Sequence, residues 1–115
     1  MRRGEIYWIS LDPSLGREAN KDRPAVIVSN DGANSMARKT SDGVITIVPI
    51  TSSSERVYPF QTLIPAGVAG LEKDSKAQAE QIRSISILRV GEIIGELPRA
   101  LMRDLDAAIA LHLGL

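Results

Sequence analysis

The stretch Lys21-Asp22-Arg23-Pro24-Ala25-Val26-Ile27-Val28-Ser29-Asn30-Asp31 contains a polar start, a proline, an unbroken apolar run and three residues that favour turns and helix starts. Proline cannot donate a hydrogen bond within a sheet, and it pushes the residue before it toward an extended backbone. We therefore predict a buried strand from Pro24 to Ser29, with Arg23 held at its mouth as a fixed cation for a ligand. Taken alone, this placement is more typical of a solvated arginine.

The composition is that of one small globular domain covering residues 1–115. Hydrophobic residues make up 43% of the chain, which is ordinary for a globular protein and too high for disorder. The 14 lysines and arginines balance 14 acidic residues. Because nucleic-acid-binding proteins usually carry a basic excess, any anionic ligand of this chain must be met by cations that are grouped locally.

Several familiar classes of protein are excluded. The chain has no cysteine and 1 histidine, so we expect neither disulfide bonds nor a zinc site. It has no glycine-rich phosphate loop, no nucleophile elbow and no carboxylate-rich calcium loop. The N-terminus lacks the apolar region of a signal peptide, and no apolar run approaches membrane-spanning length. We therefore predict a cytoplasmic protein without a metal, a cofactor or a membrane contact.

The remaining pattern favours short strands separated by turns, with a helix at the end. We predict a short irregular or helical segment after residue 30, with Asp31 as its N-cap, and a final helix that starts at Pro98 and is capped by Gly114. This order indicates a mainly β protein with α additions, built as a small, strongly bent antiparallel sheet or partly open barrel. The further predicted strands cover residues 5–11, 44–50, 57–64, 75–87 and 89–97.

Two polar loops are candidates for a binding site. Residues 12–22 have turn signals and no periodicity, and they carry Arg17, Glu18 and Lys21 toward Arg23. A loop of this length in a compact domain is often a binding or lid element.

The second polar loop follows the central predicted strand and begins with four hydroxyl residues, Thr51 to Ser54. It is either a fragment of a flexible linker or the lip of a site, and it includes Ser52, Ser53 and Arg56. We predict a polar cleft between this loop and the loop of residues 12–22.

Other side chains have a structural and a functional interpretation. Gln81 and Arg83 are expected on one face of a strand beside small alanines, as either a shallow polar strip or a solvated face. Trp8 is expected as a core or core-edge anchor rather than a base-stacking residue. His112 lies near the end of the last helix, where we expect it to interact favourably with the helix dipole rather than to act in catalysis.

An ordered set of short motifs resembles the MazF/PemK-like toxin family over nearly the whole chain. The motifs are Arg3-Gly4-Glu5-Ile6-Tyr7-Trp8, Gly16-x-Glu18, Arg23-Pro24 running into Val28-Ser29-Asn30-Asp31, Pro49-Ile50-Thr51, Glu80-Gln81-Ile82-Arg83-Ser84 and the helix from Leu105 to Leu113.

The resemblance implies an SH3-like barrel that forms a homodimer. It also implies the toxin component of a type II toxin–antitoxin system, which cleaves single-stranded RNA such as mRNA at specific sequences without a metal and so inhibits translation and growth. The expected protein partner is a cognate antitoxin whose acidic C-terminal tail fills the RNA groove.

The family's active-site arginine matches Arg23, its hydroxyl residue matches Thr51 and its loop glutamate matches Glu18, so the resemblance assigns these three as catalytic residues. Arg17 departs from the serine that the family often has at this position, which is expected to alter loop contacts and sequence preference. The predicted RNA-binding residues are Arg17, Lys21, Ser52, Ser53, Arg56, Gln81 and Arg83.

Two alternatives stay open at the level of the sequence. Gyrase-binding toxins share the same barrel and catalyse nothing, but they resemble one another in a C-terminal tryptophan, whereas this chain ends in Leu113-Gly114-Leu115. A degenerate family member that has become a binding module is the third interpretation.

Overall fold

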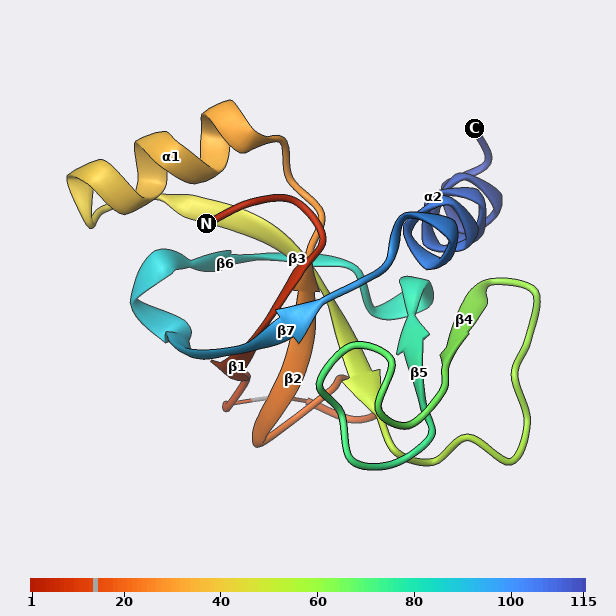
Figure 1. Ribbon diagram of the computed structural model, residues 1–115. Helices are drawn as coiled ribbons and strands as arrows, with labels where there is room; N and C mark the ends of the chain where they lie inside the picture. Colours follow the sequence, from red (N-terminus) through yellow and green to blue (C-terminus); the bar gives the residue numbers. More distant parts are fainter. Residues whose placement is uncertain (14) are drawn as a thin grey trace.

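The computed structural model describes residues 1–13 and 15–115, so residue 14 of the predicted first loop lies outside the described part. A bent sheet and two α-helices make up the fold (Figure 1). The strands are β1 Glu5–Ser10, β2 Asp22–Ile27, β3 Val44–Thr51, β4 Gln61–Ile64, β5 Ser75–Gln78, β6 Arg83–Ser86 and β7 Val90–Glu96. The helices are α1 Asp31–Thr40, α2 Arg99–Leu113 and the short 3₁₀ helices η1 Ala79–Gln81 and η2 Ile87–Arg89.

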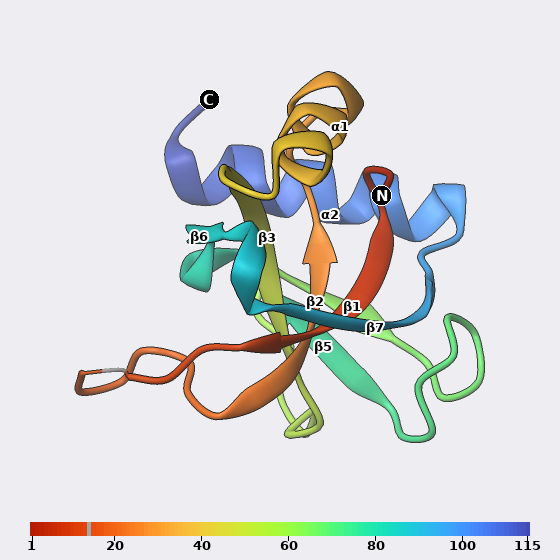
Figure 2. The same ribbon diagram turned by 90° about the vertical axis from the view of Figure 1, so that its left-hand side faces the viewer.

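The sheet is antiparallel throughout and bends strongly, which confirms the predicted mainly β class with a C-terminal helix. Its strand order is β4-β5-β3-β2-β1-β7, and β6 pairs with β3 beside this path. The path leaves β4 and β7 at its two ends, so the described strands form a partly open barrel rather than a closed one. Both α-helices lie at one end of the molecule, and the β1–β2 loop lies at the other (Figure 2).

The central strands are buried on both faces because each face packs into its own cluster. Along β3, Val48 belongs to a cluster that α2 covers through Leu105, whereas its neighbour Ile47 belongs to a cluster that α1 covers through Ala37. Successive side chains of a strand point to opposite faces, so the continuous apolar run of β3 supplies both clusters. The predicted strand of residues 44–50 is thus confirmed as a central strand, and it is covered on both faces.

The predicted strand of residues 75–87 is wrong as one continuous element. β5 pairs with the end of β3 and β6 pairs with its beginning, so the chain must turn a corner between them, which it does through η1. The predicted strand of residues 57–64 is also too long. A turn in which the Gln61 amide donates to the Tyr58 carbonyl at 2.8 Å occupies its first half.

The N-cap predicted at Asp31 is wrong by one residue. Asn30 caps α1, because its Oδ1 accepts a hydrogen bond from the Ala33 amide at 2.8 Å. Asp31 instead accepts a hydrogen bond from the Arg3 amide at 2.7 Å. The C-terminal cap of α2 at Gly114 is confirmed, since this residue has a left-handed φ of 74° and its amide bonds back to the helix.

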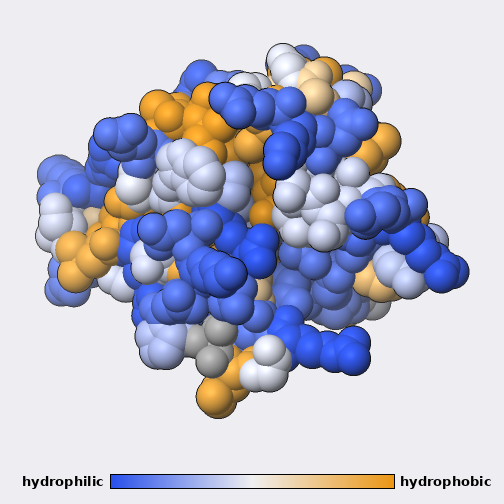
Figure 3. Space-filling view, turned by 90° about the horizontal axis from the view of Figure 1, so that it is seen from below, coloured by the Kyte–Doolittle hydropathy of each residue, from blue (hydrophilic) through white to orange (hydrophobic). Residues whose placement is uncertain are grey.

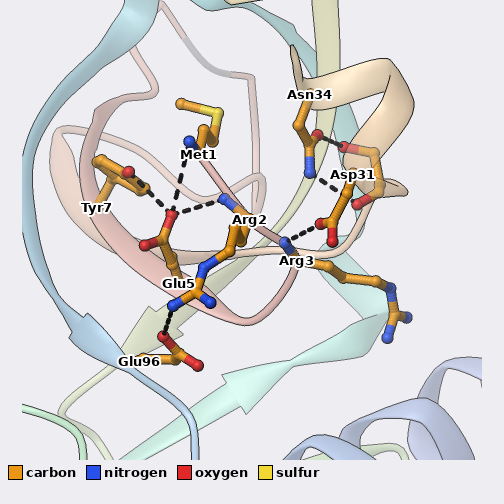
Figure 4. A network of polar contacts seen from close by, with 9 residues as sticks. Met1, Arg2, Arg3, Glu5, Tyr7, Asp31, Asn34 and Glu96 are labelled. Carbon is orange, nitrogen blue, oxygen red and sulfur yellow. Dashed lines mark hydrogen bonds and ion pairs between the residues drawn. The ribbon is translucent and has the colours of Figure 1, made fainter.

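A network of polar contacts fixes the start of β1 (Figure 4). The Arg3 guanidinium donates to the Val28 carbonyl at 2.7 Å and pairs with Asp106 of α2 at 2.6 Å. The Glu5 carboxylate accepts a hydrogen bond from the Tyr7 hydroxyl at 3.1 Å. Burial raises the pKa of Tyr7, and the hydrogen bond to Glu5 raises it further. Together with the hydrogen bond from the Arg3 amide to Asp31, these contacts tie the start of β1 to both helices.

Two glycines let the segment of residues 65–74 approach the backbone of β7. A Cβ at Gly95 would lie 2.1 Å from the Ala69 carbonyl oxygen, and Gly70 has a φ of +86°. We expect Gly95→Ala to lower the free energy of unfolding by about 1–3 kcal/mol, as overpacking of a rigid backbone contact does. Urea unfolding measures this loss. Gly70→Ala tests the same close approach, and Gly67→Ala is its matched control, because Gly67 has a similar φ of +80° but nothing within 4 Å of an added Cβ. A Gly95→Ala protein with the parental midpoint would contradict the close approach.

Candidate functional site

An open cleft of about 520 Å³ lies where β2 begins and β3 ends. Its walls come from β1, β2, β3, β7 and the segment of residues 70–75, and they mix apolar side chains with two cations and two carboxylates. Figure 3 views the molecule from the side to which the β1–β2 loop extends, where mostly hydrophilic residues surround smaller hydrophobic patches. The lining residues are Trp8, Asp22, Arg23, Pro24, Ile50, Ser52, Gly70, Leu71, Glu72, Lys73, Ser75 and Ile94.

The register of the sheet brings the predicted arginine and hydroxyl together. β2 and β3 pair Ala25 with Pro49 and Val26 with Val48. The pairing of these two strands ends at Ala25 and Pro49. Arg23 lies two residues before Ala25 in β2, and Thr51 lies two residues after Pro49 in β3, so both residues lie beyond the same end of this pairing.

Asn20 holds the Arg23 guanidinium at two points. Arg23 Nε donates to the Asn20 carbonyl at 2.9 Å, and Arg23 Nη2 donates to Asn20 Oδ1 at 3.2 Å. These bonds use two of the five N–H donors of the guanidinium and leave three for a ligand. Both partners are neutral, and within residues 1–13 and 15–115 no carboxylate forms an ion pair with Arg23. The site therefore offers an oriented guanidinium that has no ion-pair partner among the described residues.

Thr51 is half-buried at the end of β3, and its Oγ1 accepts a hydrogen bond from the Ser53 amide at 3.3 Å. Accepting this bond orients the oxygen and leaves the hydroxyl hydrogen available to donate. The next residue, Ser52, lines the cleft itself, whereas Ser53 is exposed outside the lining. Of these three hydroxyl residues, Ser52 therefore lines the cleft, and Thr51 lies directly before it at the end of β3.

Glu18 does not line the cleft. Its carboxylate accepts a hydrogen bond from the Leu15 amide at 2.6 Å within the β1–β2 loop and is exposed to solvent. Arg17 and Lys21 are exposed on the same loop. The structure thus gathers Arg23 with Ser52 in the cleft and places Thr51 directly before Ser52, while Arg17, Glu18 and Lys21 are exposed on the β1–β2 loop.

Gln81 contacts this loop rather than a strand face. Its Oε1 accepts from the Ala19 amide at 3.0 Å, and its Nε2 donates to the Arg17 carbonyl at 3.0 Å. Gln81 lies in η1 and Arg83 in β6, so the two do not form the polar strip that one continuous strand would have given. Their roles in RNA binding stay predictions.

Arg56 lies on the loop after β3 beside an aromatic pair. Its guanidinium carbon is 4.9 Å from the centroid of the Tyr58 ring, and that ring stacks on Phe60 at 5.3 Å. The Lys76 ammonium donates to the Arg56 carbonyl at 2.7 Å. This loop thus presents a basic and aromatic surface near the end of β3.

Sequence reasoning missed several residues of the site. Trp8, expected as a core or core-edge anchor, is 47% exposed and forms part of the cleft wall, so it is not a core residue. It shares a face of β1 with Ile6, whereas Tyr7 and Ile9 belong to the buried cluster on the other face. Lys73 could not be found from sequence, because the 65–74 segment reaches the cleft only through its contact with β7.

Two features are absent from the described residues. Between residues 1–13 and 15–115, no group of three His, Cys, Asp or Glu side chains is arranged to hold a metal ion. In the same ranges, no helix is long and apolar enough to cross a membrane.

The fold is a bent, partly open antiparallel sheet with a C-terminal helix, and its open cleft contains an arginine held by a neutral residue. Known structures share this fold. A MazF of Deinococcus radiodurans superposes with a TM-score of 0.83 at 24% identity, over 100% of this chain and 97% of that one. A mycobacterial endoribonuclease in complex with its cognate antitoxin superposes with a TM-score of 0.77 at 26% identity, over 100% and 96% of the two chains.

The chain belongs to the PemK-like, MazF-like toxin family of type II toxin–antitoxin systems, whose family model matches residues 2–113. It is 55% identical to Endoribonuclease MazF9 of Mycobacterium tuberculosis over 115 residues, which are 100% of this chain and 98% of the relative. The resemblance inferred from the sequence motifs is thereby confirmed, and the gyrase-binding alternative is not favoured.

Proposed function

We propose that this protein is the toxin of a type II toxin–antitoxin system and acts as a metal-independent endoribonuclease on single-stranded RNA. The observation that carries the proposal is the Arg23 guanidinium, which the neutral Asn20 holds in an open cleft at the end of the sheet where β3 ends in Thr51. Its family membership and a relative named as an endoribonuclease at 55% identity support the same activity.

The chemistry needs stabilisation of charge at phosphorus. The 2′-oxygen of one ribose attacks the adjacent phosphorus and the bond to the 5′-oxygen breaks, giving a 2′,3′-cyclic phosphate and a 5′-hydroxyl. The 2′-hydroxyl loses its proton, and the leaving 5′-oxygen gains one. Negative charge grows on the phosphoryl oxygens, where Arg23 supplies charge-assisted N–H donors and the Thr51 hydroxyl adds a further donor. Arginine stays protonated in proteins, so its role is electrostatic rather than that of a base.

Glu18, which matches the family's loop glutamate, is one candidate for the base, and a substrate-bound water is another. The Glu18 carboxylate lies on the β1–β2 loop and is hydrogen-bonded to the Leu15 amide. Acting as the base would require this loop to bring Glu18 to the 2′-hydroxyl, since a base must reach within about 3 Å of the proton it removes. RNA contacts by Arg17, Lys21, Ser52, Ser53, Arg56, Gln81 and Arg83 would then place the strand across the cleft.

The proposed assembly is a homodimer of single-domain chains of residues 1–115, acting in the cytoplasm. The proposed regulator is a cognate antitoxin with an acidic tail, which would place its carboxylates where the phosphates of RNA bind. A structural neighbour in complex with its own antitoxin supports such a partner.

The test is cleavage of a long single-stranded mRNA by the purified protein in an excess of chelator. We expect discrete fragments with 2′,3′-cyclic phosphate and 5′-hydroxyl ends, at a rate that the chelator does not change. Arg23→Ala, purified in the same way, controls for contaminating ribonucleases. RNA that stays intact with the parent protein would support the non-catalytic or degenerate alternatives.

The pH dependence of the chemical step should lack the bell shape of a histidine-dependent ribonuclease. Histidine normally titrates between about pH 5 and 8. His112 is exposed in the last turn of α2, at the end of the molecule opposite the β1–β2 loop (Figure 1). We expect single-turnover rates without a falling limb across that range, and a His112→Ala protein at the parental rate. A bell that disappears in His112→Ala would make His112 the catalyst.

A further inference from the structure

We propose that Asn20 is a positioning residue that orients the Arg23 guanidinium for catalysis, and that Gln81 holds the loop which delivers Asn20. The inference rests on the proposed ribonuclease function for its consequence in catalysis, but the positioning itself can be measured without RNA. Neither residue touches the scissile phosphate in this account, since both act through Arg23.

The clamp fixes the plane of the guanidinium. One bond to the Asn20 carbonyl and a second to Asn20 Oδ1 join Nε and Nη2 to the same residue. Rotation about the Nε–Cζ bond breaks the second bond, so the side-chain amide of Asn20 resists this rotation. Because catalysis by preorganised donors depends on their direction, an arginine held in one plane loses less freedom when it meets the phosphate.

The clamp is also neutral, which distinguishes Arg23 from Arg2 and Arg3. Arg2 pairs with Glu96 at 2.8 Å and Arg3 pairs with Asp106 at 2.6 Å, so each has a carboxylate partner. A carboxylate at position 20 would hold Arg23 as well as asparagine does, but it would offset the charge and compete with the phosphate. An amide gives orientation without this competition.

The backbone turns sharply to bring Asn20 back onto Arg23. The residue between Asn20 and β2, Lys21, has a φ of +63°, a left-handed conformation that costs a non-glycine residue on the order of 1 kcal/mol. Two hydrogen bonds hold Lys21 in this conformation. The Lys21 amide donates to Asp12 Oδ1 at 2.9 Å, and the Lys21 carbonyl accepts a hydrogen bond from the Leu11 amide at 2.9 Å. Strain of this kind persists where the surrounding structure over-determines it.

Gln81 supports the same loop from the far side of the barrel wall. The side-chain amide of Gln81 donates to the Arg17 carbonyl and accepts from the Ala19 amide, each at 3.0 Å. These two backbone groups flank Glu18. One side chain therefore fixes the backbone on both sides of Glu18 and immediately before Asn20. Gln81 is half-buried, and its two described contacts use both ends of its amide.

The first test measures positioning without RNA. Carbon-detected NMR reports the rate of rotation about the Nε–Cζ bond of individual arginines. We expect the rotation of Arg23 to be faster in Asn20→Ala than in the parent and to stay slow in Asn20→Asp, with Arg56 unchanged as an internal control. Equal rotation rates of Arg23 in the parent and in Asn20→Ala would overturn the inference, whether or not the protein cleaves RNA.

The second test is a double-mutant cycle in single-turnover cleavage. Asn20→Ala should lower the rate at saturating enzyme by roughly 10- to 100-fold, as the loss of a hydrogen bond to a charged group would. In an Arg23→Ala background the same change should have an effect of less than about twofold, because Asn20 acts only through Arg23. Losses that multiply in the double variant would overturn the inference.

A matched asparagine controls for lost stability. Asn30→Ala removes the N-cap of α1, at about 1 kcal/mol, and should leave the cleavage rate unchanged in both backgrounds. Asn20→Asp adds a further distinction, since it should keep Arg23 ordered but weaken RNA binding about tenfold through its added negative charge. A parent protein that cleaves no RNA would refute the proposed function, while the rotation rates would still decide the role of Asn20.

Discussion

Arg23→Ala should lower the single-turnover rate of RNA cleavage by two to three orders of magnitude while leaving the fold intact. The expected loss is about 3–4 kcal/mol of transition-state stabilisation, which is typical of removing one preorganised donor to a developing oxyanion. The side chain is half-buried at the start of β2, and its described hydrogen bonds go only to Asn20, so its removal opens no core cavity.

Two further variants sharpen this experiment. Arg23→Lys keeps the charge but not the planar, multidentate geometry, so it should recover only a small part of the lost rate. Arg103→Ala removes an exposed arginine of α2 and should cleave at the parental rate. Circular dichroism and urea unfolding establish that each variant is folded. An Arg23→Ala protein that cleaves within a few-fold of the parent would place the active site elsewhere.

Thr51→Val should lower the rate of RNA cleavage by about 100-fold, whereas Thr51→Ser should stay within a few-fold of the parent. Valine keeps the shape and the β-branch of threonine but cannot donate a hydrogen bond, and serine keeps the hydroxyl without the methyl group. Thr51 Oγ1 also accepts a hydrogen bond from the Ser53 amide at 3.3 Å, so the valine variant loses the bond that orients the following loop.

The two contributions to Thr51 can be separated. Ser53→Pro removes the amide that donates to Thr51 Oγ1 and leaves the threonine hydroxyl in place. If the donor function of Thr51 is what matters, this variant should keep far more activity than Thr51→Val. Equal activity of Thr51→Val and Thr51→Ser would reduce Thr51 to a residue that packs at a strand end.

The arginine–hydroxyl pair illustrates how far a sequence leads toward a site. Pro24 marks the start of a strand, and the polar run after Ile50 marks the end of another, so both Arg23 and Thr51 can be assigned to strand ends. That these two ends are neighbours depends on strands β2 and β3 pairing in one particular register. Local pattern contains no such information, and only the family resemblance joined the two residues beforehand.

Sharp changes of chain direction and contacts between distant segments account for the wrong predictions between residues 75 and 87. The run from Ser75 to Ile87 has strand-like residues throughout, but β3 can pair with it only in two pieces, so the tertiary pairing breaks it at η1. Because of the same break, Gln81 does not lie on a strand face but contacts the β1–β2 loop. A propensity of a few tenths of a kcal/mol per residue does not outweigh pairing of this kind.

The sequence by itself determined the class of fold, the buried central strands, the capped final helix and the family, because these depend on apolar periodicity, on turn residues and on ordered motifs. The tertiary structure alone decided that Trp8 and Lys73 line the cleft and that Asn20 clamps Arg23. The physical reason is that these placements arise from a left-handed turn at Lys21 and from a close backbone approach at Gly95, both of which the assembled sheet imposes on residues far apart in the chain.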